Sequence, residues 1–146
     1  MDFSKLIDGV SLTPLKIISN PLGNVYHGLK AEESSFIKFG EAYFSTITKG
    51  TVKPWKKHMR MTLNIIVPVG EIKFVLYDER EESKSKGCFF EISLSLQNYF
   101  RITIPPNIWV AFRGEGKNNL LLNIANLSHD PDELVRKDLN FFNYKW

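Results

Sequence analysis

The chain has 146 residues, with 19 Lys and Arg against 16 Asp and Glu, and 43% of its residues are hydrophobic. A chain of this length fits one domain, since domains cluster at about 100 to 150 residues, and this excludes a two-domain enzyme. The net charge of +3 is spread along the sequence. Because nucleic-acid binding requires a dense basic face, no nucleic-acid partner is expected.

The longest apolar stretches, such as residues 65–67 and 120–122, are a few residues long. A membrane span needs roughly 20, so no membrane partner is expected. The N-terminus carries Asp2 and has no apolar segment of signal-peptide length. Cys88 stands alone, which excludes an internal disulfide and favours a cytoplasmic location.

The first 35 residues are the least periodic part of the chain. We expect residues 1–35 to form an N-terminal arm, in which residues 6–18 give a strand or a segment that joins a neighbouring subunit.

Short runs rich in Val, Ile, Phe and Tyr follow, and turn-forming residues separate them. Residues 72–77 and 100–104 alternate with period two, which is typical of half-buried antiparallel strands. Hairpin-like connections fall at 69–71, 83–87 and 113–119. The pattern predicts seven to nine strands in a β-sandwich or jelly roll, with its core over about 36–130.

In the C-terminal segment 131–146 the alternating strand pattern gives way to helix-capping residues and an aromatic tail. Asp130 can cap a helix, Pro131 suits its first position, and Glu133 stands three residues after the cap. These signals predict a short helix over about 131–139. The aromatic tail 141–146 is expected to pack on the barrel or on a second subunit.

Two segments, 53–62 and 104–112, concentrate polar and aromatic residues. Together with their neighbours they resemble the cupin family of sugar-nucleotide epimerases, typified by dTDP-4-dehydrorhamnose 3,5-epimerase. The resemblance covers roughly residues 36–134 and rests on six motifs that occur in the family's order: GEAYFST, WKKH, VPVGEIKFVLYDER, SLQNY, ITIPPNIWVAF and HDPDE.

The resemblance implies an all-β cupin fold, a double-stranded β-helix or jelly roll, over a single domain 1–146 that ends in the short predicted helix. It also implies a homodimer that binds a nucleotide-linked 4-keto-6-deoxy sugar in its barrel. The expected activity is epimerisation or isomerisation by proton abstraction next to the ketone, in the synthesis of a surface polysaccharide.

Metal binding can be tested against the general cupin pattern of three His and one Glu. Lys56 and His58 stand at the first two His positions, Leu63 or Asn64 at the Glu position, and Val110 at the last His position. A divalent ion needs three or four N, O or S ligands. We therefore predict no metal and no other cofactor.

The catalytic base has two candidates. If the family's catalytic His aligns with the first position of the motif, Lys56 stands there; if a shorter loop shifts the alignment, His58 takes that role. We favour His58, because an imidazole titrates near neutral pH whereas a lysine base needs its pKa lowered by burial.

The remaining candidate residues are assigned to substrate binding. Lys53, Lys56 and Arg60 supply positive charge for a diphosphate or an enolate oxygen. Aromatic and amide side chains are expected to line the pocket: Trp55, Asn64, Trp109 and Asn123.

Two departures from the family leave alternatives open. Asn123 stands where the family has its Tyr acid, and Val110 stands where it has a second His; Tyr43, Tyr77 and His129 are other available polar groups. The alternatives are a catalytically inactive cupin that binds a sugar nucleotide or a partner protein, and a sugar-nucleotide 3,4-ketoisomerase.

Overall fold

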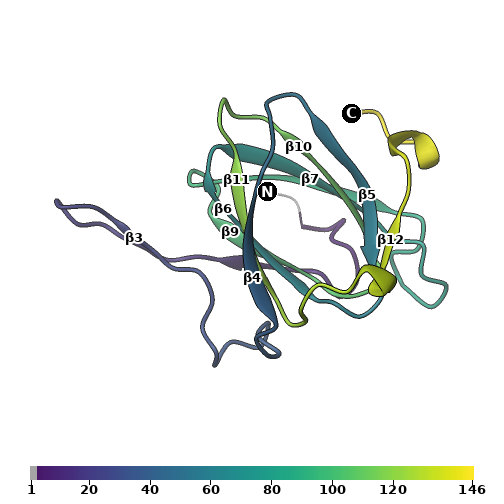
Figure 1. Cartoon of the computed structure of the whole chain (residues 1–146), viewed down its shortest axis with the longest axis horizontal. Coiled ribbons are helices and arrows are strands. Elements are labelled where there is room, and N and C mark those ends of the chain that lie inside the picture. Colours follow the sequence, from purple (N-terminus) through teal and green to yellow (C-terminus); the bar gives the residue numbers. More distant parts are fainter. Residues whose placement is uncertain (1–2) are drawn as a thin grey trace.

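Two antiparallel β-sheets make up most of the computed structural model, which describes residues 3–146 (Figure 1). The first sheet has the order β1-β9-β6-β11-β4 and the second has the order β12-β5-β10-β7-β8. The strands of the first sheet are β1 (Ser11–Pro14), β4 (Glu41–Thr46), β6 (Leu63–Val69), β9 (Phe100–Ile104) and β11 (Leu120–Ala125). Those of the second are β5 (Val52–His58), β7 (Glu71–Tyr77), β8 (Phe89–Ser95), β10 (Trp109–Gly114) and β12 (Leu134–Arg136).

The chain crosses repeatedly from one sheet to the other, which fits the jelly roll that the resemblance implies. The prediction of an all-β chain is confirmed, but seven to nine strands is too few. Residues 3–146 contain twelve strands, because β2 (Ile17–Ile18), β3 (Val25–Tyr26) and β12 are too short to show an alternating pattern. Within these residues no helix is long and apolar enough to cross a membrane.

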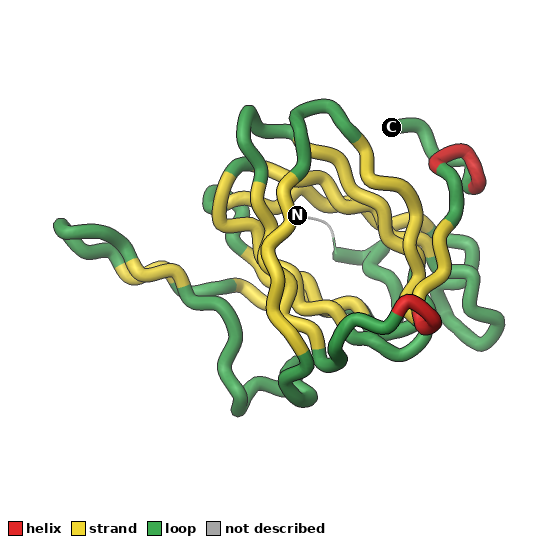
Figure 2. The backbone as a smooth tube through the Cα atoms, viewed as in Figure 1, coloured by secondary structure: helices red, strands yellow, loops and turns green. Residues whose placement is uncertain are grey.

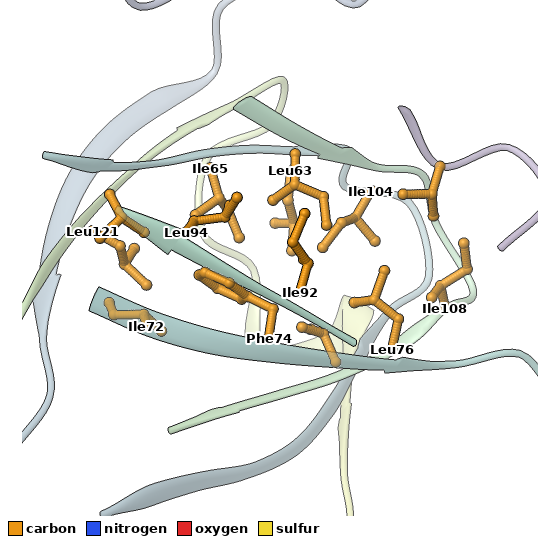
Figure 3. Packing of buried hydrophobic residues seen from close by; sticks show 14 of the residues in the cluster. Leu63, Ile65, Ile72, Phe74, Leu76, Ile92, Leu94, Ile104, Ile108 and Leu121 are labelled. Carbon is orange, nitrogen blue, oxygen red and sulfur yellow. The ribbon is translucent and has the colours of Figure 1, made fainter. Parts of the chain in front are cut away.

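The main core lies between the two sheets and consists of side chains from alternate strand positions (Figure 3). In β7, Ile72, Phe74 and Leu76 enter this core, whereas Val75 and Tyr77 belong to a separate cluster on the other face of the strand. Both faces of the second sheet are therefore covered, and the period-two pattern read from the sequence marks the inner face.

The outer face of the second sheet is covered by the C-terminal tail. We call this group the tail cluster: Trp55, Val75, Trp109, Ala111, Phe142, Tyr144 and Trp146. The Phe142 ring lies with its centroid 5.3 Å from that of Trp55 and 5.4 Å from that of Trp109. The indole N–H of Trp55 also donates to the Leu139 carbonyl at 3.2 Å. The predicted packing of the tail on the barrel is thus observed.

The predicted C-terminal helix over 131–139 is wrong. The chain forms a single 3-10 turn, η1 (Pro131–Glu133), then strand β12, and then a second turn, η2 (Leu139–Phe141) (Figure 2). Asp130 caps η1 as expected, since its side chain accepts from the Asp132 amide. The helix does not continue because the next three residues pair with β5, whose sheet edge satisfies their backbone groups.

The N-terminal arm covers the outer face of the first sheet. Arg101 of β9 is fully buried there, and its guanidinium donates to the Gly28 carbonyl, to Glu33 and to the Ser35 hydroxyl. Strand β1 pairs with β9, whereas the hairpin of β2 and β3 extends away from the barrel (Figure 1).

The tail cluster gives a stability prediction. We expect Phe142→Ala to lower the free energy of unfolding by about 2 to 3 kcal/mol, just below the range for fully buried Phe, because the ring is half-buried. Urea unfolding followed by tryptophan fluorescence measures the change. Phe141→Ala is the matched control, because Phe141 is exposed, and its change should stay below about 1 kcal/mol. Equal losses in the two variants would contradict the assignment.

Candidate active site

A cavity of about 410 Å³ opens between the two sheets. It lies between β4, at the edge of the first sheet, and the edge pair β5 and β12 of the second. We call it the barrel pocket. Apolar side chains from the core form part of its wall: Leu63, Ile65, Phe112 and Leu121.

Strand β5 supplies three of the pocket's polar side chains, because a bulge interrupts the regular alternation of its side chains between the two faces of the sheet. Its pairing with β10 shifts register between Val110, opposite Lys56, and Phe112, opposite Lys53, so β5 carries one extra residue there. Such a bulge changes which face the following side chains occupy. Lys53, Lys56 and His58 consequently all line the pocket.

His58 and Glu133 form a hydrogen-bonded pair at the pocket wall. His58 Nδ1 is bonded to Glu133 Oε1, and the two side chains are 12% and 2% exposed. The second carboxylate oxygen of Glu133 accepts from the backbone amides of Arg60 at 3.0 Å and Met61 at 3.2 Å. Burial opposes ionisation of Glu133, but the hydrogen bonds from His58 and the two amides outweigh it and hold the pKa of the carboxyl below its ordinary value.

The protonation of His58 follows from this pairing. An ionised carboxylate only accepts hydrogen bonds, so Nδ1 must carry the hydrogen that bonds to Glu133. In the neutral ring Nε2 is then the free lone pair, and the carboxylate orients it. His58 is a pocket residue, so this arrangement can remove a proton from a molecule bound there.

Three cations gather at the same pocket. Lys53, Lys56 and Arg136 line it, and Lys56 lies directly opposite Arg136 in the β5–β12 pairing. Among residues 3–146, no carboxylate forms an ion pair with any of the three; Lys53 Nζ instead donates to Ser45 Oγ at 2.7 Å. Burial, with Arg136 and Lys53 nearby, lowers the pKa of Lys56. The cluster suits an anionic ligand.

The opposite wall carries an amide and a phenol. Asn123 of β11 lies directly opposite Tyr43 of β4, and its Nδ2 donates to the Tyr43 hydroxyl oxygen at 3.0 Å. Both residues line the pocket, as do Glu41 and His129.

Four of the eight predicted site residues line this pocket: Lys53, Lys56, His58 and Asn123. Trp55 and Trp109 do not, because they lie in the tail cluster on the other face of the second sheet. The Arg60 guanidinium is 59% exposed and pairs with Asp130. The Asn64 side chain bonds the Ser35 carbonyl and Thr103, which ties the arm to the first sheet.

From the sequence alone, Glu133 is predicted to be a capping residue, Arg136 has no predicted role, and Tyr43 is only an available polar group. No local pattern marks Glu133, since it lies 75 residues from His58 in the chain. The alternation of Lys56 and His58 with Trp55 was a usable signal, because it places the aromatic on the opposite face.

The part of the chain that the structure describes was compared with the requirements of a metal site. Residues 3–146 contain no group of three or more His, Cys, Asp or Glu side chains that could hold a metal ion.

The solved structures include a relative that matches nearly the whole chain. The dTDP sugar isomerase from Desulfovibrio desulfuricans G20 is 35% identical with a TM-score of 0.91, over 96% of this chain and 92% of that one. The RmlC dTDP-6-deoxy-D-glucose-3,5-epimerase from Legionella pneumophila Philadelphia 1, 20% identical with a TM-score of 0.81 over 90% of this chain and 73% of that one, shares the fold.

Two curated proteins are also similar. The spore coat polysaccharide biosynthesis protein SpsL of Bacillus subtilis (strain 168) is 28% identical over 129 residues, which are 88% of this chain and 85% of that protein. The probable low-salt glycan biosynthesis epimerase Agl13 of Haloferax volcanii is 27% identical over 133 residues, with 87% and 85% covered. No protein-family model matches the chain. With a 35% identical relative aligned over nearly its whole length, the chain belongs to the RmlC-like family of sugar-nucleotide epimerases and isomerases.

Proposed function

We propose that the protein is an epimerase or isomerase of a nucleotide-linked 4-keto-6-deoxy sugar that serves the synthesis of a surface polysaccharide. The observation that carries this proposal is the His58–Glu133 pair at the wall of the barrel pocket. Epimerisation next to a ketone requires a positioned base inside a cavity, and an imidazole oriented by a carboxylate can act as one.

The reaction begins when His58 Nε2 takes the hydrogen from a carbon next to the C4 ketone. The electron pair of that C–H bond moves onto the ketone oxygen, which becomes an enolate. Glu133 stabilises the imidazolium that forms, because the carboxylate is held ionised by two backbone amides as well as by His58. Lys56 is the second candidate base, since burial and the nearby cations lower its pKa, but no carboxylate among the described residues orients it as Glu133 orients His58.

The cations are assigned to the negative charges of the substrate. A nucleotide-linked sugar carries a diphosphate, and the enolate adds charge at the ketone oxygen during the reaction. Lys53, Lys56 and Arg136 line the pocket without a carboxylate partner in residues 3–146 and can bind either group.

Solvent-deuterium uptake tests the base. In D₂O the wild type should introduce deuterium next to the ketone of a dTDP-, GDP- or CDP-linked 4-keto-6-deoxy sugar, and His58→Gln should slow this by about 10² to 10⁴-fold. Glu133→Gln should give a smaller decrease, because the base remains but loses its orienting carboxylate. His27→Gln is the control, since His27 lies in the arm and does not line the pocket.

The outcomes separate the alternatives. Full exchange in His58→Gln with loss in Lys56→Met would make Lys56 the base. Binding of all three substrate types without exchange would favour an inactive cupin. Exchange that yields a 3-keto product identifies a 3,4-ketoisomerase, whereas an inverted carbon with the ketone still at C4 identifies an epimerase.

The role of Arg136 is tested by binding. We expect Arg136→Gln to weaken the affinity for dTDP by about 10-fold, the effect of losing one charge-assisted contact of about 1.4 kcal/mol. Titration calorimetry at low ionic strength measures it. Lys137→Gln is the matched control, because Lys137 is the next cation in the chain and lies over the Phe141 ring outside the barrel pocket. Equal weakening in both variants would indicate a general charge effect.

We also propose that the protein is a cytoplasmic homodimer. The lone cysteine, Cys88, is free and exposed, which suits a reducing compartment. The projecting hairpin supports the dimer: a two-stranded hairpin is marginal in water by itself, and five of its large apolar side chains are exposed. These side chains are Ile17, Ile18, Leu22, Val25 and Tyr26.

Sedimentation velocity tests the dimer. The wild type should sediment at twice the chain mass of 16.9 kDa. The double variant Ile18→Glu, Val25→Glu places two like charges opposite each other on the hairpin and should shift the protein to monomer. Lys86→Glu, on an exposed loop away from the hairpin, should leave the mass unchanged. A monomeric wild type would refute the dimer.

A further inference from the structure

Epimerisation needs a second group, one that returns a proton to the face opposite the base. Asn123 stands where the resemblance expects a tyrosine acid, and an amide cannot release a proton in this pH range. The pocket must therefore provide a donor from another position if it inverts a carbon. Apart from His58 and the cations assigned to the negative charges of the substrate, the proton donors that line it are Tyr43, Ser45 and His129.

We propose that Tyr43 is the catalytic acid, its hydroxyl positioned from the neighbouring strand by Asn123. This inference rests on the proposed function and assigns a second catalytic residue to the same pocket. Tyr43 belongs to the first sheet and His58 to the second, so the two groups approach the pocket from opposite walls. A substrate between them has one face toward each.

The hydrogen bonds of Asn123 show that the Tyr43 hydroxyl accepts from the amide and does not donate to it. The Asn64 backbone amide, which can only donate, bonds to Asn123 Oδ1 at 3.1 Å. The oxygen and nitrogen of the Asn123 amide are thereby assigned, so Nδ2 is the atom that donates to the Tyr43 oxygen at 3.0 Å. Tyr43 accepts this bond with a lone pair and keeps its own hydrogen. No acceptor for that hydrogen is found in residues 3–146, and it is free to point at a bound molecule.

The surroundings keep the phenol protonated. Burial raises the pKa of Tyr43, and the negative charge of Glu41 raises it further. The hydrogen bond from Asn123 lowers this pKa, but by less than the other two effects raise it. Ser45 is a weaker candidate, because an alkyl hydroxyl is a much weaker acid than a phenol. His129 follows β11 in the loop that leads to Glu133, and it is the competing candidate.

The proton balance is complete without a cofactor. Once His58 has taken the first hydrogen, the enolate reverts to the ketone as its carbon forms a new C–H bond on the opposite face. The O–H bond of Tyr43 breaks in this step and leaves a tyrosinate. Water returns a proton to Tyr43 and accepts one from His58, which restores both groups.

The experiment separates the two proton transfers. With dTDP-4-keto-6-deoxyglucose in D₂O, the wild type should give both an epimerised product and deuterium in recovered substrate. In Tyr43→Phe we expect formation of the epimer to fall by about 10² to 10⁴-fold, while deuterium uptake into recovered substrate falls by less than about 10-fold. Removal still occurs at His58, but the proton returns to the original face.

Tyr99→Phe is the matched control, because it removes a hydroxyl that donates to the His27 carbonyl outside the pocket, and both rates should stay at wild-type values. The inference is overturned if Tyr43→Phe epimerises normally, if it loses exchange and product equally, or if His129→Gln is the variant that retains exchange and loses product. A wild type that shows neither exchange nor product overturns the proposed function itself, and this inference with it.

Discussion

The pairing of β12 with β5 is the interaction on which the site depends. It replaces the helix that the capping residues favour, and it places Glu133 beside His58 and Arg136 opposite Lys56. The pairing covers a sheet edge that would otherwise present unpaired backbone groups to solvent. One backbone ladder therefore closes the second sheet and completes the candidate active site.

The bulge in β5 determines which side chains of the strand lie on each of its two faces. Without the extra residue, strict alternation would place Lys53 on the same face as Trp55. With it, Lys53 joins Lys56 and His58 in the pocket while Trp55 stays fully buried in the tail cluster. The polar side chains of β5 therefore face the pocket, whereas Trp55 of the same strand packs in the tail cluster. The outer face of β5 is covered, and its inner face remains accessible to a ligand.

The sequence predicts the parts of this molecule that depend on local pattern. Alternation identifies the inner face of β7, and the Asp130 cap forms as expected. Two features were missed: the edge pairing that ends the helix at Glu133, and the opposite orientation of Trp55. The edge pairing is decided by a segment far along the chain and leaves no local signal at Glu133. The orientation of Trp55 does have a local signal, because its alternation with Lys56 and His58 places the ring on the face away from the pocket.

The β5–β12 pairing also brings two positive charges together, which destabilises the free protein. Like charges directly opposite each other on a ladder are destabilising, and Lys56 faces Arg136 with Lys53 nearby. The packing of Phe142 against Trp55 and Trp109 follows within a few residues and offsets this repulsion by burying apolar surface. Under the proposed function this repulsion is expected, because the charges that repel one another in the free protein are those that attract an anionic substrate. The tail cluster contributes to the site indirectly, because Trp55 packs in it and belongs to β5, the strand that carries Lys53, Lys56 and His58.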